Sequence, residues 1–137
     1  MTEQDEQTGG GTYPADRTAA IRQVMMPRDT NALGYIFGGV ILSQIDIAAA
    51  IEAHRHHLSK VVTVAMDEVE FKQPVFVGDL VSFFTKTTRV GTTSVTVKVE
   101  VWAQRRFGGG QYAFVTEALV TMVAVDDDLK PVPLISP

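Results

Sequence analysis

The chain of 137 residues contains no cysteine, so neither disulfide bonds nor thiolate chemistry can contribute to its stability or function. Basic residues are in the minority, 12 against 16 acidic ones, and the net charge of −4 argues against nucleic acid as a partner. No apolar run approaches the roughly 20 residues that a membrane-spanning helix requires. The polar, acidic start of the chain does not resemble a signal peptide. These absences predict a soluble, cytoplasmic protein.

The composition indicates one folded domain. Apolar residues make up 45% of the chain and charged residues 20%, which is typical of a globular protein. The length suits a single domain. Residues 1–17 contain Gly9-Gly10-Gly11 and few apolar side chains, so we expect a flexible N-terminal tail there. The domain is then expected over residues 18–133, with residues 134–137 as a C-terminal tail.

Hydrophobic periodicity predicts the elements of this domain. One long helix begins near Gly38 and ends between His54 and Leu58. A change in the parity of the apolar residues near Asp67-Glu68 suggests a β-bulge in the strand that follows. The order of strand, helix and four further strands predicts an α+β fold in which one antiparallel sheet covers the helix. The strands are expected at about residues 18–26, 60–71, 80–88, 94–101 and 112–125.

The helix contains the most informative residue of the chain, Asp46. Ser43 and Gln44 are the only other polar side chains in its first three turns, and a helix that is apolar nearly all round is normally buried. A buried carboxylate loses hydration worth several kcal/mol unless something compensates. Asp46 is therefore either a catalytic group or a member of a structural ion pair, for which Arg22 and Arg28 are candidates.

Eight short segments follow one another in a characteristic order and spacing: Asp29-Thr30-Asn31-Ala32-Leu33-Gly34, Phe37-Gly38-Gly39, Gln44-Ile45-Asp46, Phe71-Lys72-Gln73-Pro74, Gly78-Asp79, Val90-Gly91-Thr92-Thr93-Ser94, Val99-Glu100-Val101-Trp102 and Thr116-Glu117-Ala118. Together they resemble the hotdog-fold acyl-CoA thioesterases. The most similar type is the small bacterial, broad-specificity acyl-CoA hydrolases (YciA-like), which are similar to the domains of cytosolic acyl-CoA hydrolases. The resemblance implies a five-stranded antiparallel sheet wrapped around one central helix, dimerising into a continuous sheet. The implied activity is hydrolysis of acyl-CoA thioesters to a carboxylic acid and coenzyme A, in fatty acid metabolism.

The residues at the helix also indicate how such a reaction would be catalysed. Thioester hydrolysis requires a base that activates water and donors that stabilise an oxyanion. Gly38 and Gly39 leave backbone N–H groups uncovered at the positive end of the helix dipole, and we expect the Gly39 N–H to bind the oxyanion. Asp46 lies two turns further along on the same face and acts as general base, or as nucleophile through an anhydride. The resemblance makes Asn31 the second catalytic residue and implies that Asn31 and Asp46 of one site come from different chains.

The resemblance implies no cofactor, since coenzyme A is itself part of the substrate. Its phosphates need a local group of basic residues in an acidic protein. The candidates for binding substrate and coenzyme A are Gly38, Arg89 with the hydroxyls of Thr92, Thr93 and Ser94, and Arg105 with Arg106. Other copies of the chain are the second kind of partner. The helix needs cover that one sheet cannot supply, so we expect at least a homodimer, extended to a tetramer or to a hexamer built as a trimer of dimers.

Each of these interpretations has an alternative. Asn31 could be only a turn former, and the two glycines could serve close packing of the helix. His54, His56 and His57 stand at a helix end, where polar groups are favoured, and Asp126–Asp128 lacks the spacing of a calcium loop, so we expect no metal site. Two other functions remain open on this fold. One is a non-catalytic acyl-CoA binding or sensing module, and the other is a dehydratase or hydratase, which generally needs a histidine base near the helix start.

Overall fold

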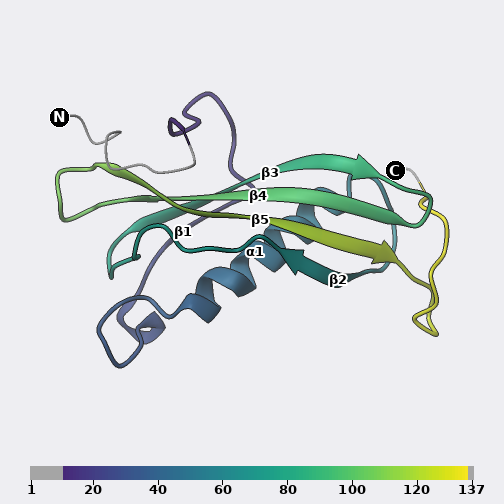
Figure 1. Ribbon diagram of the computed structural model, residues 1–137, viewed down its shortest axis with the longest axis horizontal. Helices are drawn as coiled ribbons and strands as arrows, with labels where there is room; N and C mark the ends of the chain where they lie inside the picture. The colour runs from purple at the N-terminus through teal and green to yellow at the C-terminus, as the bar shows by residue number, and fades with distance from the viewer. Residues whose placement is uncertain (1–10, 136–137) are drawn as a thin grey trace.

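One five-stranded antiparallel sheet curls around a single long helix (Figure 1). The computed structural model describes residues 11–135. The strands pair in the order β1-β3-β4-β5-β2, every pair antiparallel. In chain order the elements are β1 (Ile21–Val24), the short 3₁₀ helix η2 (Pro27–Asp29), α1 (Gly38–Ala53), β2 (Val61–Asp67), β3 (Leu80–Val90), β4 (Ser94–Gln104) and β5 (Tyr112–Ala124). The α+β architecture predicted from the sequence is confirmed.

The core lies between α1 and the concave face of the sheet. Along β4 the four valines Val95, Val97, Val99 and Val101 alternate with polar residues, and each valine is fully buried. The helix contributes isoleucines and alanines on the facing side, and the small alanine side chains allow its backbone to approach the sheet closely. The buried residues of α1 are Ile41, Ile45, Ala48, Ala49, Glu52 and Ala53.

A second cluster of aromatic side chains lies on the outer face of the sheet and corrects the predicted N-terminal boundary. Its buried members are Phe84, Trp102 and Phe114. Tyr13 packs over them and stacks on Tyr112 with 3.9 Å between ring centroids. Arg17 donates a hydrogen bond to the Thr85 carbonyl oxygen at 3.0 Å. The flexible tail predicted for residues 1–17 is therefore too long, because these contacts hold the chain from Tyr13 onward. Residues 1–10 lie outside the described residues.

The edge strand β2 is shorter than predicted, and its irregularity lies elsewhere. Its register with β5 shifts between Thr63 and Ala65, which places the irregularity at Val64 and not near Asp67-Glu68. The strand ends at Asp67. Glu68 then has a φ of 63°, a left-handed conformation that an extended strand does not accommodate. The change of parity in the sequence therefore marks the end of the strand.

The C-terminal segment packs beyond the predicted end of the domain at residue 133. The Leu134 N–H donates to the Thr92 carbonyl oxygen at 3.0 Å. The Ile135 N–H donates to Nδ1 of His57, also at 3.0 Å. The backbone of this segment thus connects the β3–β4 turn to the end of α1.

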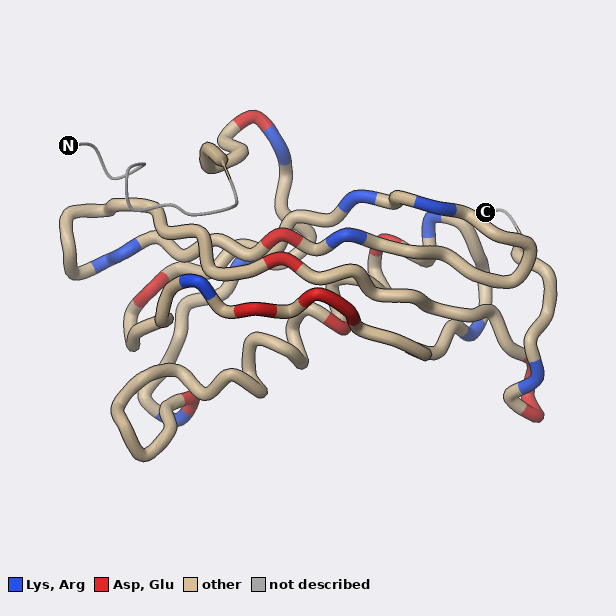
Figure 2. The backbone as a smooth tube through the Cα atoms, viewed as in Figure 1, with Lys and Arg blue, Asp and Glu red and all other residues tan. Residues whose placement is uncertain are grey.

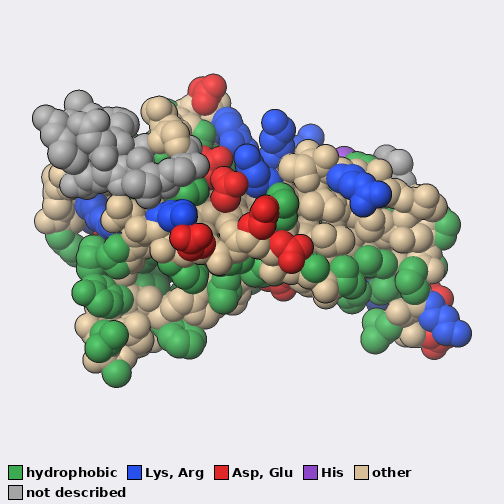
Figure 3. All heavy atoms as spheres, viewed as in Figure 1, with side chains coloured by type: hydrophobic (Ala, Val, Ile, Leu, Met, Phe, Trp, Pro, Cys, Tyr) green, Lys and Arg blue, Asp and Glu red, His purple; other side chains and the backbone are tan. Residues whose placement is uncertain are grey.

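The single chain leaves apolar surface uncovered on α1 and β2. Ile47 and Ile51 of the helix are 49% and 47% exposed, and Val64 of β2 is 58% exposed. β2 is also a free edge of the sheet. Acidic and basic residues are distributed along the strands of the sheet (Figure 2), whereas apolar side chains gather at the end that carries the start of α1 (Figure 3). No helix in the described part of the chain has the length and apolar character to cross a bilayer.

Candidate active site

The start of α1 presents free backbone N–H groups. Phe37 precedes the helix in an extended conformation, no side chain caps this end, and the first turn contains no acidic residue. The Val40 N–H donates to the Phe37 carbonyl oxygen at 3.0 Å, which leaves the N–H groups of Gly38 and Gly39 available to a ligand at the positive end of the helix dipole. At Gly39 a Cβ atom would lie 2.5 Å from a ring carbon of Phe37, so a side chain there would displace that ring.

Asp46 lies two turns further along α1 and contacts β2. Its carboxylate accepts a hydrogen bond from the hydroxyl of Thr63. Among the described residues, neither Arg22 nor Arg28 forms an ion pair with it, so the structural alternative for Asp46 receives no support. Asp46 is only partly buried in the single chain, which corrects the full burial expected from the sequence. The difference arises because the sheet of one chain does not cover the whole circumference of the helix.

Asn31 organises the loop that precedes α1. Its side-chain oxygen accepts hydrogen bonds from the N–H groups of Leu33 at 2.9 Å and Tyr35 at 3.2 Å. The Asn31 backbone N–H in turn donates to the Tyr35 carbonyl oxygen at 2.7 Å. The side chain is thus a turn former, and the same bonds fix its orientation. Within the described residues its NH₂ group has no hydrogen-bond partner.

The most buried carboxylate of α1 is Glu52, which sequence reasoning did not single out. Glu52 is 7% exposed and accepts hydrogen bonds from the hydroxyls of Thr85 at 3.0 Å and Thr87 at 2.7 Å. His56 Nε2 lies 2.9 Å from the oxygen of Thr87. Because the Thr87 hydrogen is directed at Glu52, the imidazole Nε2–H is the donor in this second bond.

These contacts define the charge of Glu52. Burial is the largest single influence and raises its pKa. The hydrogen bonds from Thr87 and Thr85, followed by the charges of Arg55 and His56, together outweigh burial and hold the pKa of Glu52 below its usual value. Both oxygens are occupied, so Glu52 is a structural anion that ties the end of α1 to β3. It is a poor candidate for a catalytic base.

An apolar cavity of about 200 Å³ adjoins the start of the helix. Its walls come from α1, with Gly38 and Ile41, and from the segment before the helix, with Ile36. The opposite wall is formed by Phe71 and Val75 of the loop between β2 and β3. The cavity therefore lies directly beside the free N–H groups of the first helical turn.

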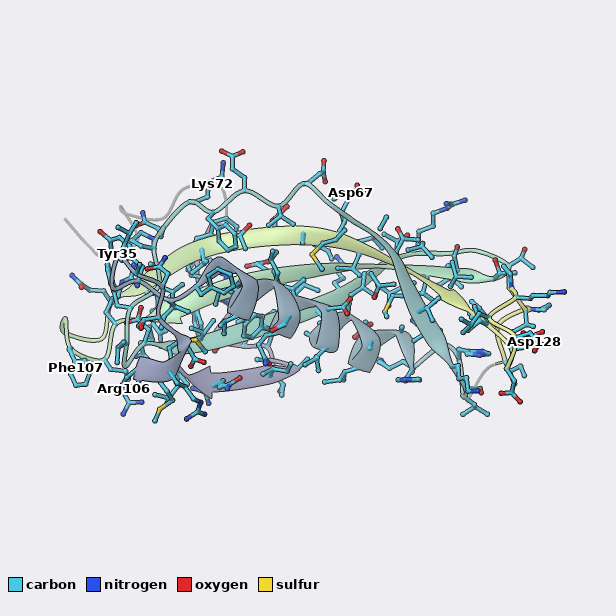
Figure 4. All side chains as sticks on the ribbon, turned by 90° about the horizontal axis from the view of Figure 1, so that it is seen from below. Tyr35, Asp67, Lys72, Arg106, Phe107 and Asp128 are labelled. Carbon is cyan, nitrogen blue, oxygen red and sulfur yellow. The ribbon has the colours of Figure 1, made fainter. Side chains whose placement is uncertain are left out.

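The basic residues predicted to bind coenzyme A lie at two opposite ends of the sheet. Arg89 pairs with Thr96 near one end of the β3–β4 ladder, and Leu80 pairs with Gln104 at the other. Nine residues of strand separate them, a distance of about 30 Å, so within one chain Arg89 with Thr92, Thr93 and Ser94 cannot share one phosphate site with Arg105 and Arg106. Figure 4 places Arg106 at the end that also carries Tyr35, with Asp128 at the opposite end.

Of the two groups, only the pair Arg105 and Arg106 lies at the end of the molecule where α1 begins. Arg105 is largely occupied, since it forms an ion pair with the buried Asp79 and its guanidinium lies 4.8 Å from the ring centroid of Phe76. Arg106 is exposed. Arg106 is therefore the better placed of the two for a phosphate, and the role of each candidate stays a prediction.

The histidines and the aspartate run have local structural partners. His57 accepts a hydrogen bond from Ile135, as described above, and His54 Nδ1 lies 3.3 Å from the His57 carbonyl oxygen. Asp126 accepts hydrogen bonds from the N–H groups of Asp128 and Lys130, which forms a turn. Among the described residues, no three histidine, aspartate or glutamate side chains come together in a way that could hold a metal ion.

Sequence reasoning missed Thr63, Glu52 and Phe71 as parts of this region. Glu52 was detectable in principle, because it interrupts the same apolar helix as Asp46. Thr63 had no comparable signal, since a hydroxyl in a strand is common. Phe71 stands in one of the segments that carry the family resemblance, but no role at the site was assigned to it. Their significance comes from contacts with α1 that only the fold establishes.

Comparison with known proteins agrees with this geometry. The family model of the thioesterase superfamily matches residues 33–106. The acyl-CoA thioester hydrolase YciA of Salmonella typhimurium is 45% identical over 116 residues, which cover 83% of this chain and 87% of that protein. A hexameric hotdog-fold thioesterase of Campylobacter jejuni is 48% identical with a TM-score of 0.82, covering 88% of this chain and 92% of that one.

A more distant structure extends the comparison to a ligand complex. An acyl-CoA hydrolase from Staphylococcus aureus, solved in complex with butyryl coenzyme A and coenzyme A, is 31% identical with a TM-score of 0.75, covering 85% of this chain and 70% of that one. The fold predicted by resemblance is confirmed by these structures. The family model matches residues 33–106, and the chain covers most of the length of a relative that is 45% identical to it. This chain therefore belongs to the thioesterase superfamily and has the hotdog fold.

Proposed function

We infer that this protein is an acyl-CoA thioester hydrolase, which releases a carboxylic acid and coenzyme A. The observation that carries the inference is the pairing, on one helix, of an uncapped glycine N-terminus with the Asp46 carboxylate, beside an apolar cavity. The 45% identical relative named as an acyl-CoA thioester hydrolase supports the substrate class. A dehydratase would need a histidine base, and the described histidines lie at the far end of α1.

The residues suggest how water attacks the thioester. The backbone N–H of Gly39 would bind the carbonyl oxygen and stabilise the negative charge that develops on it. Asp46 would remove a proton from water as the water oxygen bonds to the carbonyl carbon. Collapse of the tetrahedral intermediate breaks the carbon–sulfur bond and expels the coenzyme A thiolate. If Asp46 attacks directly, its oxygen bonds to the carbonyl carbon, the carbon–sulfur bond breaks to expel the coenzyme A thiolate, and water then hydrolyses the resulting anhydride. Neither route calls for a metal or a separate cofactor.

The catalytic site is proposed to form between two chains. Within the described residues, Asn31 and Asp46 of one chain form no hydrogen bond with each other. A second copy paired along the free edge of β2 would cover Val64 and continue the sheet. It would bring its own Asn31 toward Asp46.

Higher assembly is proposed on the same grounds. The exposed Ile47 and Ile51 of α1 need cover that one sheet does not provide. The Campylobacter jejuni relative is described as hexameric, which favours a trimer of dimers here. We place the enzyme in the cytoplasm, where acyl-CoA is made and consumed.

The function is tested by incubating the protein with a panel of acyl-CoAs and following free thiol. We expect thiol release on at least one acyl-CoA at a rate proportional to the enzyme concentration. Release of thiol distinguishes hydrolysis from a dehydratase reaction, which leaves the thioester intact, and from a binding module, which leaves the substrate unchanged. Absence of thiol release across the panel, with acyl-CoA binding retained, would favour the binding module.

A further inference from the structure

The apolar cavity beside the helix start has a defined orientation with respect to the reaction. It borders Gly38, and the N–H group expected to bind the thioester oxygen belongs to the next residue, Gly39. A thioester carbonyl held there has two arms, the acyl chain and the sulfur with its pantetheine. Only one of these two arms can occupy the cavity.

The lining of the cavity favours the acyl arm. Ile36, Ile41, Val75 and Phe71 provide most of its walls, and the polar side chains among them are Tyr35 and Gln73. The pantetheine arm carries two amides and a hydroxyl, which would lose their hydration in such surroundings without enough partners. A hydrocarbon chain gains free energy from the same surface.

The cavity is held open by backbone hydrogen bonds. The Ile36 N–H donates to the Val75 carbonyl oxygen at 2.9 Å, so the wall before the helix is joined to the loop wall. The Lys72 N–H donates to the Val115 carbonyl oxygen at 2.7 Å, which anchors the loop wall to β5. The largest side chain in the loop wall is that of Phe71, which is 44% exposed. Its ring lies beside Gly38, where a Cβ atom would be 3.6 Å from the nearest ring carbon, an ordinary contact distance.

We propose that this cavity is the acyl-chain pocket and that Phe71 is the residue that limits the length of chain it accepts. The proposal rests on the acyl-CoA hydrolase function inferred above. The cavity has a volume of about 200 Å³. If each methylene group takes about 30 Å³, the volume that one water molecule occupies in the liquid, the cavity accommodates roughly six or seven such groups. Hexanoyl to octanoyl chains would therefore fill it, and longer chains would have to displace the Phe71 ring.

The test is the dependence of kcat/KM on acyl-chain length, measured on a saturated series from acetyl-CoA to dodecanoyl-CoA. For the wild-type enzyme we expect an increase of roughly fourfold for each methylene up to the hexanoyl–octanoyl range and no further increase beyond it. Phe71→Ala should move this break to longer chains and raise the decanoyl to butanoyl ratio of kcat/KM by about tenfold or more. Phe71→Trp, which enlarges the same wall, should move the break to shorter chains.

A matched control is Phe107→Ala, which removes the same ring from the β4–β5 hairpin, where it is 86% exposed. This variant should keep the wild-type length profile. The proposal is overturned if both Phe71 variants change kcat/KM by one common factor for all chain lengths, since Phe71 would then act only on folding or on pantetheine. Failure of the inferred function has a different signature, because the wild-type enzyme would then release no thiol from any member of the series.

Discussion

Replacing Asp46 with asparagine is expected to lower kcat for acyl-CoA hydrolysis by about 10²-fold or more, the usual scale for loss of a general base. The amide keeps the size of the side chain and retains an oxygen that can accept the hydrogen bond from Thr63. It has no basic oxygen that could take a proton from water, and it cannot attack a thioester. The fold should therefore survive while the chemical step fails. Steady-state kinetics with a short-chain acyl-CoA, followed by free thiol, measures the loss.

The control for this substitution is Asp128→Asn. Asp128 is an exposed aspartate in the turn after β5, at the end of the molecule opposite Tyr35 (Figure 4), so the same change of charge occurs away from the site. Its kcat should stay within about twofold of the wild type, as is usual for a surface substitution. If Asp46→Asn turned over acyl-CoA at the wild-type rate with its fold intact, the base would have to be another residue.

The second large effect is expected on stability. Glu52→Ala removes the acceptor of two threonine hydroxyls, Thr85 and Thr87, at a buried position. A buried donor without a partner costs about 1–3 kcal/mol, partly offset here because a buried charge is removed as well. We expect the free energy of unfolding to fall by about 2–3 kcal/mol, measured by urea denaturation at one fixed protein concentration, since assembly also contributes to stability.

The lowered pKa of Glu52 also predicts how its contribution to stability changes with pH. The pKa of Glu52 is lower in the folded protein than the ordinary value of 4.5, so folding favours its ionised form. Its stabilising contribution is fully present above pH 4.5 and is lost as the pH falls through the lowered folded pKa. Glu52→Gln and Glu52→Ala should both lose this component, whereas the exposed control Glu70→Ala should keep it. An unchanged pH profile in Glu52→Gln would show that the carboxylate charge does not stabilise the fold.

The helix and the sheet were predictable because their signals are local and repeated. Four valines in alternation along β4 indicate one buried face with little ambiguity, and the apolar run after Gly38 indicates a long helix. The glycines at its start and Asp46 within it suggested the proposed chemistry for the same reason. An apolar helix tolerates a carboxylate or an uncapped glycine turn only where something outside the helix compensates.

The remaining features depend on contacts between distant segments. Tyr13 was assigned to a tail because nothing near it in the sequence shows that Phe84 and Trp102 lie on the outer face of the sheet. Arg89 and Arg105 seemed equivalent as strand-end arginines, and only the register of β3 with β4 separates them. The burial of Glu52 rather than Asp46 depends on which face of α1 meets β3. None of these is a property of a short segment.

The claim that each catalytic site contains residues of two chains can be tested by mixing two inactive variants. Asn31→Ala chains retain Asp46, and Asp46→Asn chains retain Asn31. In a randomly exchanged equal mixture about half of the dimers are mixed, and each mixed dimer has one intact and one doubly substituted site, so about one quarter of all sites should be intact.

We therefore predict recovery of up to about one quarter of the wild-type thiol release after exchange, with no recovery when either variant is incubated alone. Subunit exchange is verified independently, by mass spectrometry of the mixed species with one variant isotopically labelled. Absence of recovery despite proven exchange would place both residues in the site of a single chain and contradict the shared site.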